Sequence, residues 1–91
     1  MNIVTETFAS KQISASANVC PAPGALAGIF CSSGSATIAI YDSAAQTTTT
    51  KIVDTFTPTV GNFTPLPFEF RLGCYIVVTG TGSFTIGYRE V

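Results

Sequence analysis

Alternation of apolar and polar side chains with a period of two residues is the feature that most restricts the fold of this chain. The pattern is clearest over residues 64–72, where one face carries Leu66, Phe68, Phe70 and Leu72. The other face carries Pro67, Glu69 and Arg71, which is typical of a strand with one side in a core and the other in solvent. Because Pro65 and Pro67 cannot donate ladder hydrogen bonds, we expect the segment to begin at a sheet edge.

Similar patterns predict strands along most of the chain. The segments, with their in-phase apolar residues, are 12–20 (Ile13, Ala15, Ala17, Val19), 36–41 (Ile38, Ile40), 51–57 (Ile52 and Phe56 opposite Val53), 74–79 and 83–91 (Phe84, Ile86, Tyr88), with 2–8 as a short first strand. Gly80-Thr81-Gly82 predicts a hairpin between the last two strands. The Thr-rich segment 43–50 predicts a mobile surface loop, since four consecutive threonines disfavour helix.

About eight short strands, separated by turn signals at intervals of about ten residues, predict an all-β fold. We expect a small two-sheet antiparallel β-sandwich of the jelly-roll type, with an open β-barrel as the alternative. The 91 residues suffice for a single domain, 1–91, in which residues 1–23 form an N-terminal arm or edge strands.

Charged residues make up only 10% of the chain, whereas about 25% is usual in globular domains. The apolar burial available to so short a chain barely offsets the entropy of ordering it, so we expect further burial in a homo-oligomer or larger assembly. The four basic residues are scattered and the net charge is −1, which argues against nucleic-acid binding and against an electrostatic membrane anchor.

The residue types needed for common catalytic and metal sites are missing or badly spaced. The chain has no histidine, and Cys20, Cys31 and Cys74 form no CxxC pair. A bridge between Cys20 and Cys31 is geometrically conceivable across Pro21–Gly24, but free, half-buried thiols are favoured. Acid–base chemistry would require paired carboxylates, Asp42 with Asp54 or Glu6 with Glu90, and a structural role is favoured for these. We therefore predict no catalytic, cofactor-binding or metal-binding residues, and no enzyme.

The aromatic residues offer one candidate for a protein interface. Phe8, Phe30, Phe56, Phe68, Phe70 and Phe84 occupy in-phase strand positions, which favours the core. Phe63 lies in a turn-rich stretch and is the candidate for an exposed anchor, with a core position as the alternative. Stacking against a sugar ring is an alternative role for Tyr41, Tyr75 and Tyr88. The polar segment 1–16 lacks the apolar run of a signal peptide, so we expect the protein to be made in a cytoplasm.

Several segments resemble small virion proteins of tailed bacteriophages. The resemblance rests on residues 24–30 (GALAGIF), 36–43 (ATIAIYDS), 66–70 (LPFEF) with Gly73-Cys74-Tyr75, and 80–85 (GTGSFT) with Tyr88. It covers most of the chain from Gly24 onward and consists of turn and strand patterns rather than a catalytic signature.

The resemblance implies a capsid decoration (cement) protein that stabilises the phage head by binding across capsid-subunit junctions. The expected partners are the major capsid protein and further copies of this chain, with no nucleic acid and no membrane. The expected location is the virion, assembled in the host cytoplasm. The alternatives are a carbohydrate- or ligand-binding β-sandwich module and a phage tail or neck adaptor component.

Overall fold

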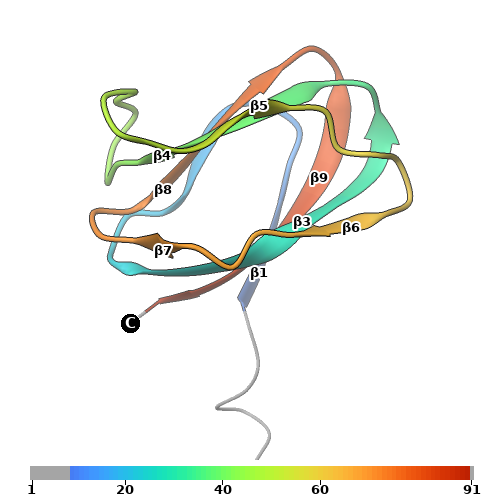
Figure 1. Cartoon of the computed structure of the whole chain (residues 1–91). Coiled ribbons are helices and arrows are strands. Elements are labelled where there is room, and N and C mark those ends of the chain that lie inside the picture. The colour runs from blue at the N-terminus through green and yellow to red at the C-terminus, as the bar shows by residue number, and fades with distance from the viewer. Residues whose placement is uncertain (1–8, 91) are drawn as a thin grey trace, which may run out of the picture.

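The core of the protein lies between two antiparallel β-sheets that face each other (Figure 1). The computed structural model describes residues 9–90, and these form strands and loops but no helix. The strands are β1 (Ala9–Ile13), β2 (Ala17–Cys20), β3 (Gly24–Gly34), β4 (Thr37–Asp42), β5 (Lys51–Phe56), β6 (Phe63–Pro65), β7 (Glu69–Phe70), β8 (Cys74–Thr79) and β9 (Gly82–Glu90). The predicted all-β, two-sheet sandwich is confirmed.

The strand connections nest within one another. Sheet A has the order β1-β9-β3-β6, with β7 also paired to β3, and sheet B has the order β2-β8-β4-β5. The first strand thus pairs with the ninth, the second with the eighth, the third with the sixth and the fourth with the fifth. This is the connectivity of a jelly roll, to which the short β7 is added. It places β1 and β2 at an edge of sheets A and B, respectively.

Apolar side chains from both sheets fill the space between them. Among those that are 2% exposed or less are Leu26, Ile29, Phe84 and Ile86 from sheet A and Ile38, Ile40 and Ile76 from sheet B. Fully burying a side chain of this kind stabilises a fold by about 1.5–3 kcal/mol. The alternation predicted for residues 36–41 and 83–91 is confirmed, because its in-phase apolar residues are those that hold the sheets together.

The single strand predicted for residues 12–20 is wrong. The chain instead turns at residues 14–16, so that Ile13 ends β1 in sheet A and Val19 lies in β2 of sheet B. The hydroxyl of Ser16 accepts a hydrogen bond from the Val78 amide at 2.9 Å, which fixes the turn against β8. Ala15, at the turn, is exposed.

The hairpin predicted at residues 80–82 is also wrong, because β8 and β9 belong to different sheets. Gly80, with φ +106°, turns the chain from sheet B to sheet A, and its position lies close against Ala36 in the connection that runs from β3 to β4. The Ser35 amide donates to the Thr81 carbonyl at 3.0 Å. The two corners are packed together, and β9 finds its partners in β1 and β3 instead of in β8.

The continuous strand predicted for residues 64–72 is interrupted. Its first part is β6 and its last part is β7, and between them the Leu66 amide donates to the Ala27 carbonyl at 2.9 Å while the Phe68 amide donates to the Leu66 carbonyl at 2.8 Å. The second bond tightens the chain around Pro67 and breaks the period of two. Leu66 and Phe70 reach the core, as predicted, whereas Phe68 is 45% exposed and Leu72 is 60% exposed.

Irregular pairing also changes β5. Val53 stands opposite Ile40 and Phe56 stands opposite Ile38, both of them core residues. Shifts of register between these pairs place Val53 and Phe56 on the same side, contrary to the prediction that Val53 faces away from Phe56. The strand predicted for residues 2–8, and with it Phe8 and Glu6, lies outside the described residues.

Candidate protein-binding surface

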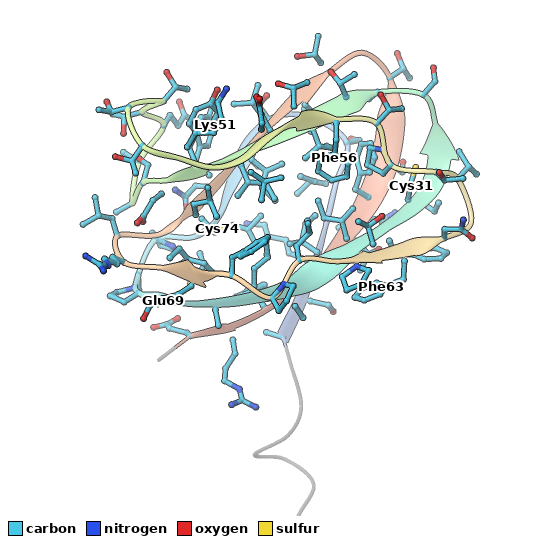
Figure 2. All side chains as sticks on the ribbon, viewed as in Figure 1. Cys31, Lys51, Phe56, Phe63, Glu69 and Cys74 are labelled. Carbon is cyan, nitrogen blue, oxygen red and sulfur yellow. The ribbon has the colours of Figure 1, made fainter. Side chains whose placement is uncertain are left out.

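Two phenylalanines lie side by side on the outer face of sheet A. Phe30 in β3 is the direct cross-strand partner of Phe63 in β6, so both side chains point to the same face. Phe30 is 38% exposed and Phe63 is 54% exposed. Figure 2 shows Phe63 pointing away from the space between the sheets. We call this pair the aromatic ridge.

A tight turn before β6 positions Phe63. Gly61, with φ +81°, adopts a backbone conformation that favours glycine, and its amide donates to the Cys31 carbonyl at 2.7 Å. The Asn62 amide donates to the Thr59 carbonyl at 3.1 Å. These bonds fix the start of β6 against β3. The ring of Phe63 then lies over Gly28, where a Cβ atom would come 2.5 Å from its Cζ atom.

The residues beside the aromatic ridge are small and uncharged. Thr85 of β9 stands opposite Phe30, and Gly87 stands opposite Gly28. Ala27 covers Gly87 with only a methyl group. Charged residues occur at the other end of β3, where Glu69 and Arg89 both stand opposite Ala25. An aromatic centre with charge at its margin is the composition of a protein–protein interface.

Sequence reasoning placed Phe30 in the core, and the structure contradicts this. In β3 the inward side chains are Leu26, Ile29 and Cys31, and the change from even to odd positions occurs at a bulge between Leu26 and Gly28. The extra residue turns Phe30 outward. A glycine inside a strand pattern is a known mark of a bulge, so Gly28 was the signal that could have revealed it.

The outer face of sheet B carries a second, smaller aromatic group. Tyr41 and Tyr75 are cross-strand partners whose ring centroids lie 6.5 Å apart at an angle of 37°. The Lys51 ammonium lies 5.8 Å from the centre of the Tyr41 ring, within the range of a cation–π contact. Tyr88 belongs to sheet A and packs against the core. The three tyrosines therefore do not form one row.

The carboxylates considered for acid–base chemistry are engaged in local contacts. The Asp42 carboxylate accepts hydrogen bonds from the amides of Arg71, Leu72 and Gly73, the shortest at 2.7 Å from Leu72. Burial raises the pKa of Asp42, but these donors and the charge of Arg71 outweigh that effect and leave the pKa below 3.8.

Asp54 is bound to Lys51 at 2.9 Å and accepts from its neighbour Thr55 at 2.8 Å. The hydrogen bond from Lys51 is the main cause of its lowered pKa, and the Lys51 pKa is raised in turn. Of the second proposed pair, Glu90 lies within the described residues and approaches the Cys20 thiol at 4.0 Å. Asp42, Asp54 and Glu90 thus each have a structural contact.

The three cysteines are free and fully buried, rather than half-buried as predicted. Cys20 and Cys31 are in different sheets, and the cross-strand partner of Cys20 is Cys74. Burial is the main cause that raises the pKa of Cys74 to about 12. Within residues 9–90 there is no cluster of metal-ligating side chains and no pocket.

The loop between β4 and β5 is anchored at its base. The buried hydroxyl of Ser43 accepts hydrogen bonds from the Ala45 amide, the Thr47 amide and the Thr47 hydroxyl, at 3.0, 3.2 and 2.8 Å. The Asn18 side-chain amide donates to the carbonyls of Ser43 and Ala45. Residues 44–50 are exposed, as expected for a surface loop.

In the part of the chain described here, no helix is long and apolar enough to cross a membrane. Comparisons with protein-family models, with curated proteins and with solved structures each find no match to this chain.

Proposed function

We propose that this protein is a structural virion protein of the capsid decoration (cement) type, which binds across junctions between capsid subunits through the aromatic ridge. The observation that carries the proposal is the pairing of Phe30 and Phe63 on an outer sheet face that lacks charge at its centre. The proposed partner is the major capsid protein, and the protein acts by contact rather than by catalysis.

The exposed rings are the expected source of the binding free energy. Apolar surface removed from water contributes about 25 cal/mol per Å², and aromatic residues, phenylalanine included, are enriched in protein–protein interfaces. The neighbouring Ala27, Gly87 and Thr85 are small, so a partner can approach the backbone of sheet A closely. Both residues lie on paired strands, so little backbone entropy is lost on binding.

The scarcity of charge supports the same reading. With four basic and five acidic residues in the whole chain, electrostatic attraction contributes little to association. Binding through the aromatic ridge is therefore expected to be nearly independent of salt. Further copies of this chain around a capsid junction would bury additional apolar surface, which is why we also propose a homo-oligomer in the particle.

The resemblance to small phage virion proteins is the reason for proposing a phage particle as the place where the protein acts. The segments on which that resemblance rests contribute much of β3, all of β4 and β7, and the first residues of β8 and β9. The compact β-domain expected for decoration proteins agrees in class with the two-sheet sandwich. Location in the virion follows only from this resemblance and forms part of the proposal.

The test measures binding of the purified protein to phage shells that lack it. Phe30→Ser and Phe63→Ser are each expected to weaken binding about tenfold or more, and the matched control Leu72→Ser should bind normally. Leu72 suits this purpose because it is 60% exposed but lies in the loop between β7 and β8. Bound protein should also raise the temperature at which the shells break.

Failure of the unmodified protein to bind any shell would refute the decoration role. Binding to isolated tails or necks instead would favour an adaptor component. If Leu72→Ser weakened shell binding as much as Phe63→Ser, the aromatic ridge would not be the contact surface.

A carbohydrate-binding module is the second candidate function, and the Tyr41–Tyr75 pair is the observation that favours it. The face of a tyrosine ring can stack on a sugar ring, and Lys51 beside Tyr41 can donate hydrogen bonds to hydroxyl groups. A glycan array tests this candidate. Binding that is lost in Tyr41→Ala and Tyr75→Ala, but kept in Phe63→Ser, would support it.

A further inference from the structure

Two of the three cysteines are paired across neighbouring strands. Cys20 ends β2 and Cys74 begins β8, and the two residues are cross-strand partners in sheet B, just after a bulge between Asn18 and Cys20. Residues opposite each other in a sheet direct their side chains to the same face. Both side chains belong to the core, with Cys20 1% exposed and Cys74 0% exposed.

The spacing of such a pair suits a covalent bond. Directly opposite residues of antiparallel strands have Cα atoms about 4.5–5.5 Å apart, and disulfides join residues whose Cα atoms are about 4.4–6.8 Å apart. The Cys20 thiol makes two weak contacts, with the Ala22 carbonyl at 3.5 Å and with the Glu90 carboxylate at 4.0 Å. The Cys20 thiol also contributes to the raised pKa of Cys74, as expected for close neighbours.

We propose that Cys20 and Cys74 form an intramolecular disulfide when the reduced protein meets a small-molecule disulfide such as oxidised glutathione. One protein thiolate attacks the glutathione disulfide and releases one molecule of reduced glutathione. The second protein thiolate attacks the mixed disulfide, which forms the Cys20–Cys74 bond and releases the second molecule. The protein loses two hydrogens and the oxidant gains them.

The oxidant reaches the pair through local opening of β2. This strand is an edge strand of four residues with only three register pairs to β8, so it opens at lower cost than the central strands. In the closed sheet, burial raises the pKa of Cys74 to about 12 and keeps its thiol protonated at neutral pH, so the exchange reaction requires this opening. The disulfide would link the edge strand β2 covalently to β8. The inference does not depend on the proposed function.

The test uses the full chain, purified with reductant and then incubated with excess oxidised glutathione. Trypsin places Cys20 and Cys31 on the peptide 12–51 and Cys74 on the peptide 72–89. The expected product is a cross-link between these peptides, with one free thiol left of three. Cys31→Ser should still form the cross-link, whereas Cys20→Ser should not.

A thermal measurement adds a second readout. In Cys31→Ser, where only this pair is present, oxidation should raise the unfolding temperature by about 5 °C or more. Three thiols remaining after prolonged oxidation would overturn the proposal, as would a mixed disulfide with glutathione that never closes. Persistence of the cross-link in Cys20→Ser would assign it to Cys31. If a variant fails to fold, fragmentation of the cross-linked peptide from the unmodified protein between Cys20 and Cys31 shows which of the two is bonded to Cys74.

Discussion

The ring of Phe63 occupies the space that a side chain at Gly28 would need. A Cβ atom at position 28 would come 2.5 Å from the ring and would also contact the Thr64 carbonyl oxygen. The exposed anchor of the proposed interface is therefore seated directly on the backbone of β3. Phe63 covers Gly28, which is buried although it belongs to the outer face.

Gly28→Ala is expected to destabilise the protein by about 1–3 kcal/mol, because the Thr64 backbone has to move away from β3. Chemical denaturation followed by circular dichroism measures this loss. Gly87→Ala is the matched control on the same face, since its Cβ would meet only the Ala27 methyl at 3.3 Å. Equal losses in the two variants would contradict the seating of Phe63 on Gly28.

Truncating the core phenylalanine and the surface phenylalanine should have very different effects on stability. Phe84→Ala removes a ring that is 0% exposed and should cost about 3–5 kcal/mol of unfolding free energy. Phe63→Ala removes a ring that is 54% exposed and should cost less than about 1 kcal/mol. Denaturant titrations of both variants provide the comparison. A large loss in Phe63→Ala would mean that this ring stabilises the fold rather than serving as an interface anchor.

Ser43→Ala is expected to lower stability by about 1–2 kcal/mol, because the amides of Ala45 and Thr47 lose their acceptor at a buried position. Hydrogen exchange should show faster exchange at these two amides. Thr49→Ala, in the exposed part of the same loop, is the control and should change stability little. Unchanged exchange in Ser43→Ala would show that the hydroxyl does not anchor the loop.

Stability should fall in acid partly through Asp42. Its folded-state pKa lies below the unfolded value near 3.8, so the ionised carboxylate stabilises the fold at pH values above about 4. That contribution is lost as the pH falls through the folded-state pKa. Asp42→Asn should therefore be less stable than the native protein at pH 7, by about 1–2 kcal/mol, and the difference should shrink towards pH 2.

Denaturation curves at several pH values test this behaviour. Asp54→Asn is the control, because the Asp54 side chain is 85% exposed and exposed ion pairs contribute little. A difference between Asp42→Asn and the native protein that stays constant from pH 7 to pH 2 would rule out the carboxylate as its source.

The strands and the buried residues were predictable where the period of two is uninterrupted. Residues 36–41 and 83–91 show this well, since Ile38, Ile40, Phe84 and Ile86 are all buried. Periodicity reports which side chains share a face, but it does not report which sheet a strand joins. For this reason the turn at residues 14–16 and the corner at Gly80 were misread as parts of continuous or paired strands.

Of the two residues that form the aromatic ridge, the sequence predicted one, Phe63. Phe63 stood out because it follows Gly61 in a turn-rich segment, whereas Phe30 lies in an apolar run where Gly28 is the signal of a bulge. The orientation of Phe30 depends on that bulge, which forms in the pairing with β9, a strand more than fifty residues away. A glycine can mark such a bulge in the sequence, but the local pattern does not report the pairing partner that forms it.

The position of β9 in sheet A has a consequence for synthesis. This strand lies between β1 and β3, and within residues 9–90 no other strand joins those two. A nascent chain that still holds β9 inside the ribosome has already released β1 and β3 with their apolar faces uncovered. Sheet A can be completed only after translation has passed residue 90. Until then the apolar faces of β1 and β3 stay exposed, and the chain is prone to aggregate.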